Sequence, residues 1–216
     1  QQSQGHDFRA FVVQGRAPQQ ALGVSVRAQP GYRRPADLRG RRIGVSAPGS
    51  STQVMASVLL ARAGVDAREV SFVGVGTGAT AVAALRTGRV HALCHADPIM
   101  SLLEHRGEVR LVSDLRTLTA AQEVFGGAMP ASCLYAPQAF LHKEPMVAQA
   151  LTNAIVHALK WLQTASPADL IKAVPASYVL GDRAVYLAAF NRVRETFSPN
   201  GLMPEDGPAT ALRALA

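Results

Sequence analysis

Residues 42–52, RIGVSAPGSST, decide the fold, because a short β-type run here passes through a Pro-Gly-Ser-Ser turn directly into a helix. The run Arg42–Ser46 is apolar enough for a buried strand. A helical pattern then extends from about Thr52 to Ala63, and Gly64 stands where a helix C-cap glycine is expected. The stretch therefore predicts a strand–loop–helix unit.

The same alternation continues after this unit, whereas before it two short strands are joined by a turn and followed by a connector. Further strands are predicted over 8–14, 21–27, 70–75, 90–95, 109–113 and 132–136, and further helices over 79–87, 99–105 and 144–164. Strands that alternate with helices over such short distances predict βαβ units and a parallel sheet. In the longest helix one apolar face is predicted to be buried, formed by Val147, Leu151, Ile155, Leu159 and Leu162.

Composition narrows the class of protein. The chain has 216 residues, of which 48% are hydrophobic and 17% charged, as in globular proteins, and a net charge of +7. Its densest basic group is Arg33, Arg34, Arg39, Arg41 and Arg42. Aromatic residues are few and do not interleave with these arginines, so the pattern predicts a solvated basic surface and no nucleic-acid partner. Such a surface would help to attract an anionic ligand.

The two cysteines, Cys94 and Cys133, form no CxxC pair, so no zinc ribbon is expected. A disulfide between them stays open, and two buried thiols are the expected outcome. No apolar run reaches the roughly 18 residues of a membrane span. The polar opening, residues 1–7, runs at once into a buried-type strand and carries no signal peptide. We therefore expect that the beginning of the protein has been removed or is not included in this sequence.

The first candidate site is the loop that enters the helix at Thr52. A helix N-terminus presents unpaired N–H groups and the positive end of the helix dipole, which attract anions. Gly49 allows close approach of the backbone, and Ser50, Ser51 and Thr52 add three hydroxyl donors. Plain helix capping needs only one hydroxyl. The pattern therefore favours a ligand site here.

A second candidate loop, residues 74–79, reads GVGTGA and also joins a strand to a helix. It fits G-x-G-x-x-A, a form of the dinucleotide fingerprint, with Asp97 near the distance of a ribose-binding acid. The helix that follows is short, and the fingerprint normally lies in the first βαβ unit, so this alternative is the weaker one. Thr77 and Gly78 are retained as candidate ligand contacts.

The polar residues at 91–97 invite a metal hypothesis, which strand alternation argues against. His91, His95 and Asp97 would point one way and Cys94 the other, over too long a span for one compact site. His95 and Asp97 at the carboxyl end of a strand are nevertheless well placed at a ligand cleft, although a structural role for His95 remains open. No arrangement typical of nucleophilic catalysis is present, and no cofactor or metal is expected.

In order along the chain, several motifs resemble one family. They are DLRGRRIGV (37–45), APGSST (47–52), FVGVGTGA (72–79), AALRTG (83–88), ADP (96–98), VFGG (124–127) and AIVHALKWLQT (154–164). The series is similar to periplasmic solute-binding proteins of ABC transporters, of the nitrate/sulfonate/taurine type, which share their fold with thiamine-precursor-binding proteins. Relatives often place an aromatic residue just before Asp-Pro, where this chain has Cys94-His95-Ala96, so the ligand stays open.

The resemblance implies an α/β, type II periplasmic-binding-protein fold with two lobes, a hinge, and a first lobe incomplete at its N-terminus. The first lobe would comprise 1–35 and 132–216, and the second 36–131. A small anionic solute, such as a sulfonate, nitrate or carboxylate, would bind between the lobes. The implied ligand-binding residues are Gly49, Ser50, Ser51, Thr52, Thr77, Gly78, His95 and Asp97, with Arg16 from the first lobe.

The same resemblance implies a periplasmic monomer that is no enzyme and delivers its ligand to a membrane permease. Two alternatives remain. One is an enzyme on a related α/β fold that binds a dinucleotide or forms a thiamine precursor, although the cysteine-rich motif of the latter is missing. The other is the effector domain of a transcriptional regulator.

Overall fold

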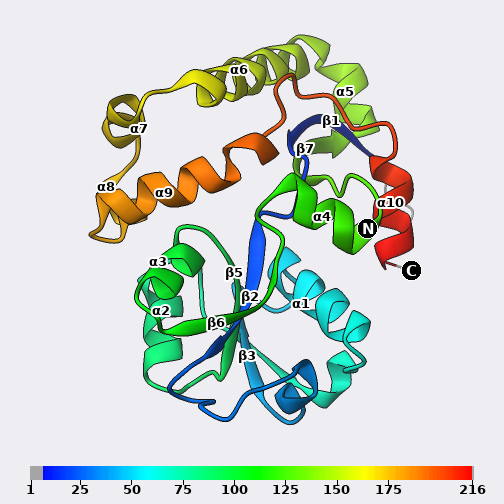
Figure 1. Cartoon of the computed structure of the whole chain (residues 1–216). Helices are drawn as coiled ribbons and strands as arrows, with labels where there is room; N and C mark the ends of the chain where they lie inside the picture. Colours follow the sequence, from blue (N-terminus) through cyan, green and yellow to red (C-terminus); the bar gives the residue numbers. More distant parts are fainter. Residues whose placement is uncertain (1–6, 216) are drawn as a thin grey trace. The chain divides into compact units, whose positions relative to one another are not determined.

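The computed structural model describes residues 7–215. Within this range the chain divides into two compact units, which are treated separately (Figure 1). The sheet unit comprises 19–116 and 167–192, and the ribbon unit comprises 7–18, 117–166 and 193–215.

A five-stranded sheet, in the order β4-β3-β5-β2-β6, forms the centre of the sheet unit. Its strands are β2 (Gln20–Ser25), β3 (Arg42–Val45), β4 (Ser71–Gly74), β5 (Ala92–Ala96) and β6 (Val109–Asp114). The predicted parallel pairing is confirmed for β3 with β4 and with β5. The strand β2, which precedes the regular alternation, joins the same sheet and is antiparallel to both β5 and β6. The connector 26–41 then turns the chain back into β3.

Helices cover both faces of this sheet. Figure 1 shows α1 (Ser51–Arg62) on one side of the strands and α2 (Ala79–Arg86) with α3 (Ile99–His105) on the other. Fully buried Leu60, Leu93 and Leu103 come from both helical layers and from β5. Burial of such side chains stabilises each by about 1.5–3 kcal/mol. The remaining helices of the unit are α7 (Pro167–Ala173), α8 (Ala176–Val179) and α9 (Arg183–Val193), and short 3-10 turns lie at Pro35–Leu38 and Ala67–Glu69.

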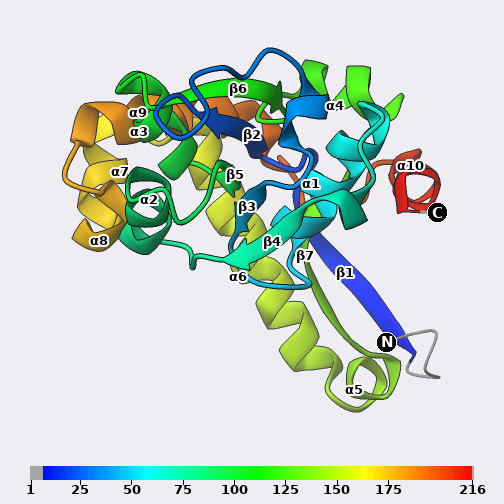
Figure 2. The ribbon, with the colours of Figure 1, turned by 90° about the horizontal axis from the view of Figure 1, so that it is seen from below.

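The ribbon unit is built on two antiparallel strands, β1 (Phe8–Gly15) and β7 (Ala131–Pro137), which extend together in Figure 2. Its helices are α4 (Leu118–Phe125), α5 (Gln138–Lys143), α6 (Pro145–Thr164) and α10 (Gly207–Leu215), with a 3-10 turn at Arg194–Thr196. The long helix predicted over 144–164 is confirmed as α6. Its predicted buried face is wrong in part: Leu159 is buried, but Val147 and Leu151 are exposed. The two-stranded ribbon is too narrow to cover the whole helix.

The strands predicted over 8–14 and 21–27 both exist as β1 and β2 but belong to different sheets. The compact units also group residues differently from the predicted lobes, since β2 hydrogen-bonds within the sheet and 117–131 within the ribbon unit. The lobe boundaries at 35 and 132 stay a prediction.

The two cysteines are free thiols. Cys94 is buried as expected, but the expectation is wrong for Cys133, which is exposed on β7. Between residues 7 and 215, no helix combines the length and apolarity needed to cross a bilayer.

Candidate functional site

The candidate residues of the sheet unit gather where β3, β4 and β5 end, here called the carboxyl edge. Strand register fixes this edge: Val45 lies opposite Gly74, and Ala96 lies opposite Gln20. The loops that follow β3 and β4, the residue Asp97 and the start of β2 therefore meet there. Open α/β sheets bind ligands at this edge.

Three hydroxyls build the loop between β3 and α1. Thr52 Oγ1 accepts a hydrogen bond from the backbone N–H of Ser46 at 2.9 Å, and it lies 3.0 Å from Ser46 Oγ and 2.8 Å from Ser50 Oγ. Thr52 is buried, so its hydroxyl serves the loop itself. The structure thus places Thr52 as the residue that holds Ser46 and Ser50 in position.

The N-terminus of α1 keeps donors available. Ser50 is the N-cap residue, yet its side chain makes no capping hydrogen bond. No acceptor from the described residues reaches the N–H groups of Ser51 or Thr52, which begin the helix. Gly49 has φ +75°, a backbone conformation that favours glycine, and this bend lets the chain enter the helix. Uncapped N–H groups together with the helix dipole form an anion-binding arrangement.

Gln20 joins this arrangement although it is absent from the residues predicted by sequence. Its Nε2 donates to Ser51 Oγ at 3.1 Å, which leaves the Ser51 hydroxyl hydrogen free to donate elsewhere. The side chain is buried and its Oε1 has no partner among the described residues. A buried polar atom without a partner costs about 1–3 kcal/mol, so a bound ligand or water that reaches Oε1 would relieve that cost. Only the register of β2 against β5 brings Gln20 here.

The second loop is tied to the first by the backbone. Val75 N–H donates to Val45 O at 2.9 Å, and Gly76 N–H donates to Ser46 O at 3.0 Å. Gly76 has φ +78°, and Thr80 Oγ1 donates back to Val75 O at 2.7 Å. This arrangement holds the loop at the edge with Thr77 exposed, and Gly78 follows as the N-cap of α2.

His95 supports the second loop through both nitrogens of its ring. The Ala96 N–H donates to its Nδ1 at 3.0 Å, so Nε2 carries the proton and donates to Gly76 O at 2.9 Å. The ring is buried and both nitrogens are occupied by backbone groups. Of the two roles left open by the sequence, the contacts fit the structural one.

Asp97 belongs to a buried charge cluster. Its Oδ1 accepts from the Ser101 N–H at 2.8 Å and lies 3.3 Å from Arg116 Nη1. The fully buried Arg116 guanidinium also binds Asp114 at 2.7 Å and Glu104 at 2.9 Å. Asp97 Oδ2 is buried without a hydrogen-bond partner among the described residues. Asp97 is therefore shared between this cluster and the edge, and it is not free in the way a ribose-binding acid would be.

Charge pairing governs ionisation within this cluster. Burial alone would raise the pKa of Asp114, but the hydrogen bond and charge of Arg116 outweigh burial and lower it. The pKa of Glu104 is also lowered, because hydrogen bonds from Arg192 and Arg116 outweigh burial. Both carboxylates are therefore ionised at neutral pH, and a neutral general acid is not available here.

Arg16 belongs to the ribbon unit, whereas the residues described above belong to the sheet unit. Its Nη2 donates to Glu195 O at 2.7 Å, and its backbone N–H donates to Thr196 O at 2.7 Å. Its Nε is buried without a hydrogen-bond partner in the described chain. A role of Arg16 in ligand binding stays a prediction.

The polar residues at 91–97 do not converge on one point in the structure. His91 Nδ1 accepts from the Arg42 N–H at the opposite end of the strands. Burial raises the pKa of the Cys94 thiol to about 12, so this cysteine is no ready thiolate. No cluster of three His, Cys, Asp or Glu side chains able to hold a metal occurs between residues 7 and 215.

Sheet topology and edge chemistry together define an α/β protein with the fold of periplasmic binding proteins. The sequence profile of the family described as NMT1/THI5 like matches residues 9–168. The chain belongs to this family. A comparison with curated proteins returned no match.

Several solved structures are similar. A protein of Bordetella bronchiseptica RB50 is 55% identical, with a TM-score of 0.96 over 99% of this chain and 67% of its own. The alkanesulfonate-binding protein SsuA from Xanthomonas axonopodis pv. citri, bound to MOPS, is 21% identical with a TM-score of 0.68, over 99% of this chain and 67% of its own. The periplasmic aliphatic sulphonate-binding protein SsuA from Escherichia coli is 20% identical with a TM-score of 0.68, over 99% and 68%.

Proposed function

We propose that this protein is a solute-binding component of an ABC importer that captures a small anionic solute and performs no catalysis. The observation that carries the proposal is the uncapped N-terminus of α1 at the carboxyl edge, where the N–H groups of Ser51 and Thr52 meet the hydroxyls of Ser50 and Ser51. The binding of sulfonates by proteins that share the fold supports an oxyanion as the solute.

The chemistry of the edge favours an acidic group with several oxygen atoms. The two free N–H groups and the Ser50 and Ser51 hydroxyls are all donors, and donors arranged around one point suit a sulfonate, nitrate or carboxylate. Thr77 and Gly78 would line the neighbouring wall. Gln20 Oε1 and Asp97 Oδ2 are acceptors, and they would meet a polar or amino group of the solute.

Function would follow from population shift. A solute that contacts both lobes only in the closed state binds that state more tightly than the open one. The difference between the two affinities sets how far the equilibrium moves toward closure. In this proposal residues 1–35 and 132–216 form the first lobe, and residues 36–131 form the second. Arg16 contacts the solute from the first lobe, and His95 acts by holding the loop 74–79 in place. The closed form would be recognised by a membrane permease in the periplasm, with the protein acting as a monomer.

The test is a calorimetric and thermal-shift panel of sulfonates, nitrate, carboxylates, pyrimidines and dinucleotides. We expect an oxyanion to bind, and Ser51→Ala to weaken its binding about 10- to 100-fold, because a hydrogen bond to a charged group contributes roughly 1.5–3 kcal/mol. Gln20→Leu should weaken binding in the same direction, since it releases the Ser51 hydroxyl.

Ser71→Ala is the matched control, because Ser71 is an exposed serine at the opposite end of the strands. It should leave affinity unchanged. Stabilisation by NAD or FAD alone would overturn the transporter hypothesis, and an unchanged affinity in Ser51→Ala would overturn the site.

A further inference from the structure

Excess positive charge is confined to one unit of the chain. The sheet unit carries sixteen Lys and Arg residues against nine Asp and Glu, whereas the ribbon unit carries six of each kind. The whole net charge of +7 therefore resides in the sheet unit.

Most of this charge lies where β3, β4 and β5 begin, at the end opposite the carboxyl edge. Register fixes this end, since Arg42 lies opposite Ser71 and Ser25 lies opposite Val109. The connector 26–41, drawn in blue, runs along it in Figure 1. The exposed arginines of this end, here called the basic pole, are Arg27, Arg33, Arg34, Arg39, Arg41, Arg42, Arg62, Arg68, Arg86, Arg89, Arg106 and Arg110.

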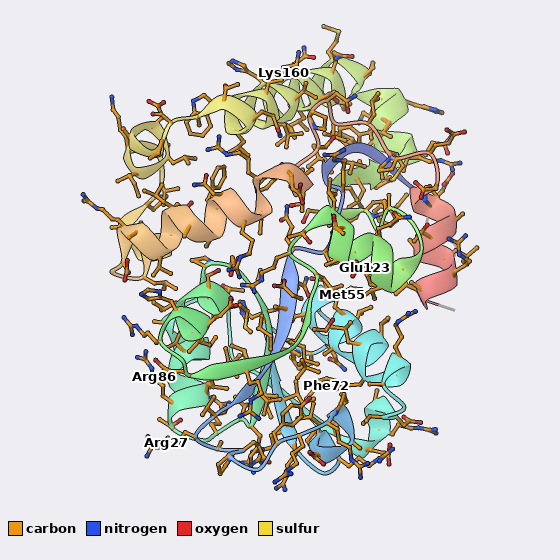
Figure 3. The ribbon with its side chains drawn as sticks, viewed as in Figure 1. Arg27, Met55, Phe72, Arg86, Glu123 and Lys160 are labelled. Atoms are coloured by element: carbon orange, nitrogen blue, oxygen red, sulfur yellow. The ribbon has the colours of Figure 1, made fainter. Side chains whose placement is uncertain are left out.

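Few carboxylates offset the basic pole. Asp37, Asp66, Glu69 and Glu108 pair with Arg34, Arg68, Arg39 and Arg86 respectively. The other eight arginines have no carboxylate of the described residues within 4.0 Å, and these are Arg27, Arg33, Arg41, Arg42, Arg62, Arg89, Arg106 and Arg110. Figure 3 shows Arg27 and Arg86 on the same flank, and Arg27 Nη1 lies 3.5 Å from Arg86 O.

Local structure accounts for only part of this charge. Arg62, Arg86 and Arg106 stand at the C-terminal ends of α1, α2 and α3, where cations offset the helix dipole. Two arginines of the connector act there as well, since Arg27 donates to Arg86 O at the end of α2 and Arg39 donates to Gly64 O just after α1.

The side chains of Arg33, Arg41 and Arg89 make no hydrogen bond or ion pair within the described residues, so their charge has no local role. The field of the basic pole is felt by His91, whose pKa is lowered by burial and by the charges of Arg42 and Arg41.

The shape of the distribution indicates the kind of partner. Five strand ends spaced about 4.8 Å apart spread the charge over roughly 20 Å, with helix ends on both sides. Single-stranded nucleic acid would need aromatic side chains for stacking, but Tyr32, the aromatic residue of the connector, is buried. We propose that the basic pole docks the sheet unit on an anionic phospholipid surface.

Docking and solute binding would use different ends of the same strands. The five residues of β5 separate the basic pole from the carboxyl edge by about 15 Å. Lipid binding at the pole would therefore leave Ser50 and Ser51 uncovered within this unit. Membrane docking is a property separate from solute capture, so a negative result for one of them does not refute the other.

The experiment is co-sedimentation of the full chain with phosphatidylcholine vesicles, with and without phosphatidylglycerol, at low and high NaCl. We expect binding only to the anionic vesicles and its loss at high salt, because screening shortens the electrostatic range to a few ångströms. Each arginine near an anionic leaflet changes partitioning roughly fivefold, so Arg33→Glu, Arg41→Glu and Arg89→Glu together should reduce it by at least about 100-fold.

The matched control reverses the same number of exposed charges in the ribbon unit, at Lys143, Lys160 and Arg213. It should retain most of the binding, and circular dichroism should show both variants folded. Equal losses in the two variants would mean that net charge alone acts, which overturns the docking surface. Absence of vesicle binding at low salt, or tighter binding of single-stranded DNA than of vesicles, would also overturn it.

Discussion

Replacing Arg116 by methionine tests the buried charge cluster that borders the candidate site. The guanidinium is fully buried and binds three carboxylates, with Asp97 7% exposed and Asp114 and Glu104 each 34% exposed. Methionine fills much of the same volume but leaves these carboxylates without their shared cation. Breaking a buried pair in this way costs about 3–5 kcal/mol. Because Asp114 and Glu104 are partly exposed and Glu104 keeps Arg192, we expect a loss near the lower end of this range, about 3 kcal/mol, in the free energy of unfolding at neutral pH.

The pH dependence separates this charge effect from lost packing. The pKa values of Asp114 and Glu104 are lowered in the folded protein, so their stabilisation is present above their unfolded pKa values of about 4 and is lost as the pH falls further. In the variant Glu104 keeps its ion pair with Arg192, whereas the burial of Asp97 and Asp114 is no longer opposed by Arg116, and protonation of these carboxylates removes the uncompensated charge. The stability deficit should therefore be largest near neutral pH and shrink below about pH 4.

Urea unfolding followed by far-UV circular dichroism is the assay. Fluorescence is less suitable, because Trp161 lies in the ribbon unit and Arg116 in the sheet unit. Arg86→Met is the matched control: its pair with Glu108 is partly exposed, so it should cost at most about 1 kcal/mol. The reasoning is refuted if Arg116→Met costs no more than the control, or if its deficit is the same at every pH.

Two further predictions concern other parts of the chain. In the folded protein an alkylating reagent should modify the exposed Cys133 and spare Cys94, because Cys94 is buried and burial raises its pKa to about 12. In urea both thiols should react. Rapid modification of Cys94 in the folded protein would contradict this prediction. Gly15→Ala should lower the free energy of unfolding by about 1–3 kcal/mol, because its Cβ would lie 2.7 Å from the carbonyl oxygen of Ala131 on the paired strand. Gly31→Ala is the control, because nothing lies within 4 Å of its added Cβ, and it should change the free energy of unfolding by no more than about 0.5 kcal/mol. Equal effects of the two substitutions in urea unfolding would exclude the steric explanation.

The local order of strands and helices follows from the sequence, because apolar periodicity and turn residues act over a few positions. The predicted helix over 99–105 matches α3 residue for residue, and the strand over 42–46 matches β3 to within one residue. The loops at 46–52 and 74–79 were recognisable as candidate sites for the same reason: glycines and hydroxyl residues stand directly before helical patterns. Their resemblance to binding proteins was likewise readable from motif order.

The hydrogen-bond partner of each candidate site residue was decided by tertiary structure. His95 and Thr52 are both predicted ligand contacts. In the fold the ring nitrogens of His95 bond to the backbone of Gly76 and Ala96, and the Thr52 hydroxyl bonds to Ser46 and Ser50. Gln20 carries no local signal, and it reaches Ser51 only because β2 runs antiparallel to β5. Hydrogen-bond capacity belongs to the residue type and is visible in sequence, whereas the use of that capacity depends on strand pairing between segments distant in the chain. The sequence by itself determined the elements and the donors, and the fold decided which donors remain free.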